Sequence, residues 1–152
     1  MRHILVVANQ TLAAQPLLTA LQERLADEPA DVFVVVPMTR PKDDVTFREG
    51  LLSSGQQRPD SGREGYETAR RRLAQGLGMI RDLGCEVRGE VGDEDPMAAV
   101  DQVMASRRFD EVIVSTLPTG VSRWLRADLP SRVHRKHHVP VTTVTPQEAH
   151  SR

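Results

Sequence analysis

Three runs of apolar, mostly β-branched residues limit the folds open to this chain, because they are almost continuous instead of alternating with polar residues. They cover residues 4–8, 32–36 and 112–115. Strands that helices cover on both faces have this pattern, whereas half-solvated strands alternate. A fourth run covers residues 139–144, and a weaker, alternating run at 85–91 suits a strand nearer a sheet edge. The sequence therefore predicts the strands of a parallel sheet.

Apolar residues recur at helical spacing between these runs, which predicts four helices. The first three stripes are Leu17, Leu18, Leu21 and Leu25; Tyr66, Ala69, Leu73, Leu77 and Ile80; and Met97, Val100, Val103 and Met104. The fourth helix is expected over residues 128–137, with Val133 facing inward. Asp95 and Pro96 suit the start of the third helix, and Gly84 suits the end of the second. Strands and helices that alternate in this way form a doubly wound α/β fold.

The length of 152 residues suits a single domain. We expect this domain to cover residues 1–146, with a flexible tail at 147–152. Residues 38–62 include the stretch SSGQQRPDSG, whose composition predicts a mobile loop. The apolar run at the start is too short for a secretion signal or a membrane span.

Composition argues against several classes of partner. The formal net charge is −1 and aromatic residues make up 3% of the chain, so neither a strong field nor stacking platforms favour nucleic acid. Cys85 is the single cysteine, which excludes a disulfide within this chain and suits a reducing compartment. The sequence predicts a cytoplasmic domain with no nucleic-acid and no membrane partner.

Three parts of the sequence carry a resemblance to a known family. ILVVANQT lies near the start, EVGDEDPMAAV leads into the third helix, and DEVIVSTLPTGVSRWL with VPVTTV lies at the end. The chain resembles the universal stress protein-like domains of the adenine-nucleotide alpha-hydrolase-like superfamily. The resemblance implies a Rossmann-like, five-stranded parallel sheet in the order 3-2-1-4-5 with helices on both faces. It also implies a role in the stress response and a homodimer that forms through the C-terminal edge strand.

The ATP motif of that family is absent. The ATP-binding members carry an acidic residue after the first strand and the pattern G-x2-G-x9-G-(S/T) after the fourth. Counting back from the VPV near the end places the glycine positions on Val114, Leu117 and Ala127 and the hydroxyl position on Asp128, while Asn9 stands at the acidic position. No cofactor is therefore predicted, and ATP or another adenine nucleotide is disfavoured.

The best candidate for a ligand site is the edge where the first and fourth strands end, because open α/β sheets bind ligands beyond the carboxyl ends of their strands. The candidate ligand-binding residues are Asn9, Thr11, Ser115, Thr116, Thr119, Gly120, Ser122 and Arg123. Their hydroxyls and backbone amides can hold a small molecule or an anion, with Arg123 as counter-ion. In the alternative interpretation, Pro118 and Gly120 shape a turn that the hydroxyls cap.

Other polar clusters have structural explanations. Asp128 suits a helix N-cap, and the arginines at 70–72 suit the solvated face of a helix. His134 and His138 have the i, i+4 spacing of a metal pair, but basic residues are also expected at a helix C-terminus, and no metal is predicted.

No catalytic motif is recognised, and no catalytic residue is assigned. The predicted function is that of a universal stress protein-like binding or regulatory domain that is not a standard ATP binder. Two alternatives remain open. One is a nucleotide-binding member with a remodelled phosphate loop, and the other is a small enzyme of the same superfamily.

Overall fold

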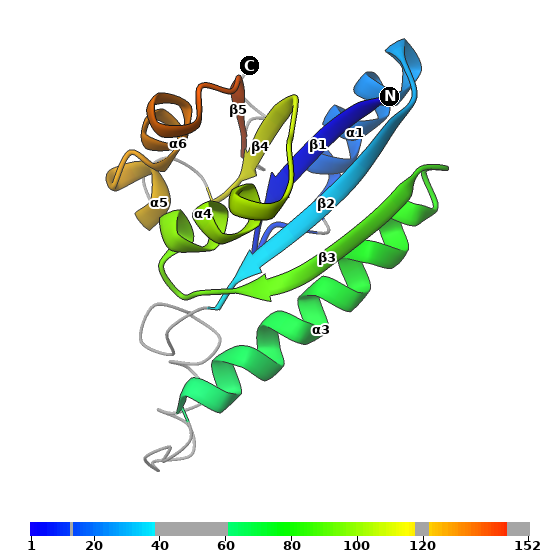
Figure 1. Cartoon of the computed structure of the whole chain (residues 1–152). Coiled ribbons are helices and arrows are strands. Elements are labelled where there is room, and N and C mark those ends of the chain that lie inside the picture. Colours follow the sequence, from blue (N-terminus) through cyan, green and yellow to red (C-terminus); the bar gives the residue numbers. More distant parts are fainter. Residues whose placement is uncertain (13, 39–60, 118–121, 146–152) are drawn as a thin grey trace, which may run out of the picture.

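Figure 1 shows a twisted sheet with helices packed on both of its sides. The computed structural model describes residues 1–12, 14–38, 61–117 and 122–145, with only the backbone at 61–64, 123 and 126. The elements are β1 (Arg2–Val7), α1 (Gln15–Asp27), β2 (Ala30–Pro37), α3 (Ser61–Arg81), β3 (Glu86–Gly92), α4 (Pro96–Ser106), β4 (Glu111–Ser115), α5 (Arg123–Arg126), α6 (Leu129–His137) and β5 (Val141–Val144).

All strands are parallel and lie in the order β3-β2-β1-β4-β5, which confirms the predicted doubly wound fold. The central strand β1 pairs with β2 through Ile4 and Val32, and with β4 through Leu5 and Val112. The alternating strand β3 lies at one edge, as its pattern predicted, and β5 lies at the other. The direction of winding reverses between β1 and β4, so the switch point of the sheet is there.

Two hydrophobic cores explain why the apolar runs are continuous. Successive side chains of a strand point to opposite faces. Ile4 and Val6 pack with buried residues of α1 and α3, whereas Leu5 and Val7 pack with buried residues of α4 and α6. Burying each such side chain contributes roughly 1.5–3 kcal/mol. The central strands are therefore fixed in register from both sides.

The helix ends follow the prediction at two positions and depart from it at a third. Asp95 caps α4 by accepting a hydrogen bond from the amide of Met97 at 3.1 Å. Gly84 takes a φ of 99° after α3, which glycine adopts without steric cost. Asp128 does precede α6, but its φ of 58° is left-handed and its side chain makes no capping bond. Asp128 thus occupies the predicted N-cap position without the side-chain bond, since such caps typically form from an extended backbone.

The segment around α3 differs from the prediction in two respects. The predicted loop at 38–62 runs two residues too far, since α3 already begins at Ser61; residues 39–60 and the predicted tail at 147–152 lie outside the described residues. Tyr66 is 44% exposed and does not belong to the buried stripe of α3.

Among the described helices, none combines the length and apolar character that a membrane crossing requires.

Glu111 joins four elements on the α1 side of the sheet. It is 4% exposed at the start of β4. Its carboxylate accepts hydrogen bonds from Arg24 of α1 at 2.6 Å, from Thr142 of β5 at 3.2 Å and from Arg2 of β1 at 3.3 Å. Burial raises the pKa of Glu111, but these donors lower it by more, so the pKa lies below its ordinary value. The carboxylate clamps α1 against β1, β4 and β5.

Candidate functional site

The candidate site lies at the carboxyl edge of the sheet, where the loop after β1 meets the loop after β4. Val7 at the end of β1 is in register with Val114, one residue before the end of β4. The residues that follow both strands therefore emerge side by side at the switch point. The candidate residues with described side chains are all buried, at most 7% exposed: Asn9, Thr11, Ser115, Thr116 and Ser122.

Two hydroxyl pairs lie at this edge, and one of them connects the two loops. Thr11 Oγ1 lies 2.7 Å from Ser115 Oγ, which joins the loop after β1 to the end of β4. Thr116 Oγ1 lies 2.6 Å from Ser122 Oγ, which also accepts a hydrogen bond from the amide of Leu125 at 3.1 Å. This last contact is of the kind that the turn interpretation predicts. A hydroxyl has one donor and two acceptor sites, so each pair retains capacity for a further partner.

The loop after β1 is held against α3 by Leu12. This side chain is 2% exposed and packs on Gly76 in the middle of α3. A Cβ at position 76 would lie 2.5 Å from Leu12 Cδ2, so only glycine leaves room for the contact. The anchored leucine fixes the position of Thr11, its neighbour in the chain.

Arg72 brings a positive charge to this edge, although its sequence context predicts a solvated side chain. It is half-buried on α3, and its Nη1 donates to Asn9 Oδ1. Asn9 in turn donates from Nδ2 to the carbonyl of Pro37, at the end of β2. The predicted solvated face is therefore right for Arg70 and Arg71, which are exposed, and wrong for Arg72.

The remaining candidate residues have no described side chain. Thr119 and Gly120 lie outside the described residues. Arg123 opens α5, and only its backbone is described. The site that can be built consequently consists of one amide, four hydroxyls and Arg72.

Solved structures share this architecture. A universal stress protein family protein from Arabidopsis thaliana with AMP bound is similar with a TM-score of 0.58 and 10% identity, covering 100% of this chain and 96% of that one. The universal stress protein from Archaeoglobus fulgidus is similar with a TM-score of 0.55 and 14% identity, covering 95% of this chain and 93% of that one. A universal stress protein in complex with cAMP is similar with a TM-score of 0.55 and 14% identity, covering 96% of this chain and 98% of that one. This chain has the universal stress protein fold. Identities this low establish the fold alone.

Sequence comparison adds no further relative. No family model matches the chain, and no curated protein matches it.

Within the universal stress protein fold, the three expected glycine positions have different surroundings. Val114 lies inside β4 and is fully buried in the core beneath α4 and α6. Its side chain therefore cannot obstruct a ligand at the edge, although one of the glycine positions falls on it. Leu117 is half-buried just after β4, and Ala127 is exposed just before α6. Only the latter two bring a side chain outside the core.

Two histidines of α6 form hydrogen bonds within the fold. His134 Nδ1 lies 2.9 Å from the carbonyl oxygen of Val139, and His137 Nε2 lies 2.8 Å from Asp101 Oδ1 on α4. Across the ranges that the structure describes, no group of three His, Cys, Asp or Glu residues is placed to hold a metal ion. Cys85 is half-buried before β3, where burial raises the pKa of its thiol.

Proposed function

We propose that this chain is a universal stress protein-like binding domain that takes a small anionic ligand at the carboxyl edge between β1 and β4. The observation that supports this most directly is the contact of Arg72 with Asn9. Asn9 lies two residues before Thr11, whose buried hydroxyl pairs with that of Ser115. Doubly wound sheets bind their ligands at this edge, and a guanidinium matches the geometry of carboxylate and phosphate groups.

The same domain is not a standard ATP binder. A triphosphate needs close approach of the backbone, which glycine permits, whereas Leu117 and Ala127 bring side chains. Asp128 adds a negative charge where ATP-binding members carry a hydroxyl. Because Asp128 is exposed, solvent screens that charge, and the side chains at 117 and 127 are the larger obstacle.

A nucleotide-binding domain with a remodelled phosphate loop is the second candidate. Two of the structural neighbours hold AMP and cAMP, which carry a single phosphate. Arg72 supplies one counter-charge at this edge, which suits one phosphate better than three. A mononucleotide is therefore expected to bind in preference to ATP.

A thermal-shift series with inorganic phosphate, AMP, cAMP and ATP separates these candidates. A ligand at a hundred times its Kd stabilises the folded state by about 2.7 kcal/mol. Stabilisation by phosphate and AMP alike supports the anion site, and stabilisation by AMP or cAMP alone supports the second candidate. Turnover of a bound ligand would favour the enzyme alternative. A chain that none of the four stabilises would contradict both binding proposals.

The chain offers a matched control for the role of Arg72. Arg72→Gln removes the charge beside Asn9, and Arg71→Gln removes a neighbouring charge from the exposed surface of the same helix. We expect Arg72→Gln to abolish the ligand-induced shift in melting temperature and Arg71→Gln to leave it intact. Equal behaviour of the two variants would show that Arg72 does not contact the ligand.

We also propose that the chain is a cytoplasmic homodimer with a role in the stress response, joined through β5. β5 is an edge strand whose residues are half-buried or exposed. The unpaired backbone groups of an edge strand invite pairing with another strand. Pro140 immediately precedes this strand, where its missing N–H is tolerated.

A further inference from the structure

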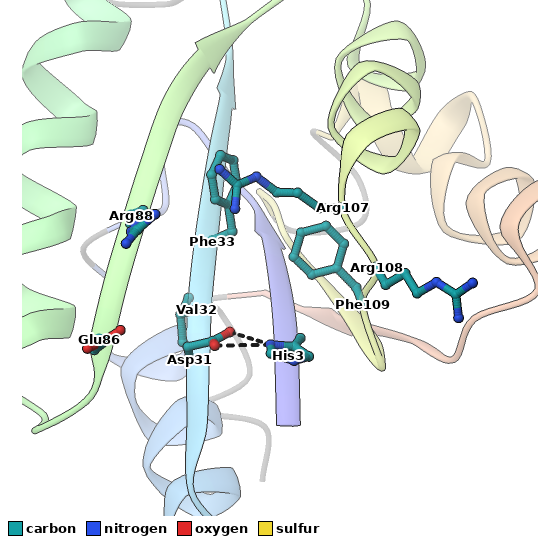
Figure 2. Close-up of a pocket in the computed structure, with 9 residues that line it drawn as sticks. All are labelled: His3, Asp31, Val32, Phe33, Glu86, Arg88, Arg107, Arg108 and Phe109. Atoms are coloured by element: carbon teal, nitrogen blue, oxygen red, sulfur yellow. Dashed lines mark hydrogen bonds and ion pairs between the residues drawn. The ribbon is translucent and has the colours of Figure 1, made fainter. Parts of the chain in front are cut away.

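A pocket of about 400 Å³ opens at the opposite end of the sheet, near the amino ends of β1, β2 and β3. Figure 2 shows its lining, which combines four basic side chains with two phenylalanines. The lining includes Phe33 of β2, Arg88 of β3, and Arg107 and Phe109 from the segment between α4 and β4. Four residues of β2, roughly 13 Å, separate Phe33 from Pro37 at the carboxyl edge. This pocket is therefore distinct from the site described above.

The pocket exists because one face of β3 is not covered. Arg88 is in register with Phe33 on the neighbouring strand. Glu86, Arg88 and Glu90 point to the same face of the sheet as Phe33, and all three are exposed. Their polar character explains the alternating sequence of this strand, since helix α4 leaves this part of the sheet open. The amino end of the sheet consequently has a ledge instead of a packed core.

Arg107 is held in place by stacking. Its Cζ lies 4.3 Å from the centroid of the Phe33 ring, which is 7% exposed. Contact with a ring leaves the N–H donors of the guanidinium available to a hydrogen-bond acceptor. Figure 2 shows Arg107 reaching across Phe33, with Arg88 on the next strand, while Arg108 points away from both. The pocket therefore presents a pre-positioned donor group.

The two guanidiniums beside Phe33 are not neutralised. Within the described part of the chain, neither Arg88 nor Arg107 forms an ion pair. The carboxylate of Asp31, also in the lining, is engaged by His3 Nδ1 at 2.9 Å. Glu86 stands in the row of Asp31, nearer the amino end of the strands than Arg88. Along β3, exposed carboxylates thus border Arg88 on both sides, Glu86 toward the amino end and Glu90 toward the carboxyl end, but neither forms an ion pair with it.

The size of the pocket and its aromatic lining indicate an organic ligand. A water molecule takes up about 30 Å³ in the liquid, so the pocket is much larger than a lone phosphate requires. Phe109 is half-buried, and its ring centroid lies 6.3 Å from that of Phe33. We propose that this pocket binds a small aryl anion, with its phosphate or carboxylate on Arg88 and Arg107 and its ring against Phe109.

An NMR titration of the full chain with phenyl phosphate tests this proposal. We expect saturable shifts of the backbone amides at 31–33, 86–88 and 107–109. Benzoate shows whether a carboxylate can replace the phosphate. Inorganic phosphate shows whether the ring of the ligand contributes to binding, and benzyl alcohol shows whether its negative charge does. Phenyl phosphate or benzoate should bind at least tenfold more tightly than inorganic phosphate, and benzyl alcohol should not bind.

Variants locate the binding groups. Arg88→Gln and Arg107→Gln should each weaken the binding of phenyl phosphate at least tenfold, and Arg70→Gln on the exposed surface of α3 should not change it. Arg107→Lys keeps the charge without the planar fork and should also weaken binding, which controls for a folding defect in Arg107→Gln. Unsaturable shifts with every probe, equal affinity for inorganic and phenyl phosphate, or unchanged affinity in Arg88→Gln and Arg107→Gln would overturn the proposal. AMP that shifts only residues near Thr11 and Ser115 supports two independent sites.

Discussion

The hydroxyl pair of Thr11 and Ser115 ties the two loops of the carboxyl edge together, and its contribution can be measured. Thr11→Val and Ser115→Ala should each lower the free energy of unfolding by about 1–2 kcal/mol, because each leaves a buried hydroxyl without its partner. The double variant should lose less than the sum, with a coupling energy of about 1 kcal/mol. Urea unfolding of the wild-type protein, the two single variants and the double variant gives this coupling energy. Strictly additive losses would mean that the two hydroxyls do not interact.

Glu111 makes stability depend on pH. Its pKa is lowered in the folded state, so its contribution is present above its unfolded pKa, near 4.5, and is lost as the pH falls through the lower folded value. We expect Glu111→Gln to cost roughly 3 kcal/mol at pH 7 and to flatten the loss of stability below pH 5. The Glu111→Gln variant should still lose some stability below pH 5, because Asp101 also has a lowered pKa.

Glu67→Gln is the matched control for Glu111, because Glu67 is exposed on α3. Its melting temperature should follow that of the wild-type protein from pH 7 to pH 3. If Glu111→Gln also follows the wild type, the buried carboxylate does not contribute to acid sensitivity.

The sequence predicted that Asn9, Thr11 and Ser115 lie at one edge of the sheet, but it did not single out Arg72. Asn9, Thr11 and Ser115 were predictable because parallel strands end at one edge and these residues follow two apolar runs. Arg72 lies in a row of three arginines, and only the rotation of α3 about its axis decides which of them faces the sheet. Its place one turn before Gly76, on the same helix face, was the available signal.

At the scale of the elements, we expect alanine substitutions at two glycines of α3 to change stability in opposite directions. Alanine is favoured over glycine inside a helix by about 1 kcal/mol. A Cβ added at Gly78 would meet no other atom within 4 Å, so Gly78→Ala should gain about that amount. Gly76→Ala should instead lose stability, because the new methyl group displaces Leu12. Urea unfolding decides, and equal gains from both substitutions would show that Leu12 yields without cost.

The edge position of β3 was predictable from its alternation, but the pocket beside it was not. The alternation of residues 85–91 indicates one solvated face. It does not reveal that Arg107, from another segment, stacks on Phe33 next to that face. The four-residue helix α5 escaped prediction because it is too short to show a periodicity. Contacts between distant segments and single helical turns leave little trace in local sequence.

At the scale of the whole molecule, β5 is the expected dimer contact. Thr143 is the exposed residue in the middle of that strand. Replacing it with proline removes a backbone donor and should dissociate a dimer that pairs through β5. Sedimentation of the wild-type chain at high concentration should show a dimer and the Thr143→Pro variant a monomer. A wild-type monomer, or a variant that remains dimeric, would reject pairing through this edge.

The obstacles to ATP can be separated by substitution. Asp128→Ser should restore little affinity for ATP, because Asp128 is exposed and the side chains at 117 and 127 remain. Adding Leu117→Gly and Ala127→Gly should improve ATP binding further, as measured by calorimetry. A large gain from Asp128→Ser alone would assign the main obstacle to charge.

Calorimetric titration of the wild-type chain with ATP tests the central claim, that a universal stress protein fold here lacks a standard ATP site. We predict no binding tighter than about millimolar, the range of roughly −4 kcal/mol. A micromolar Kd for ATP would contradict the claim and show that the loop between β4 and α6 holds a triphosphate without the glycine motif.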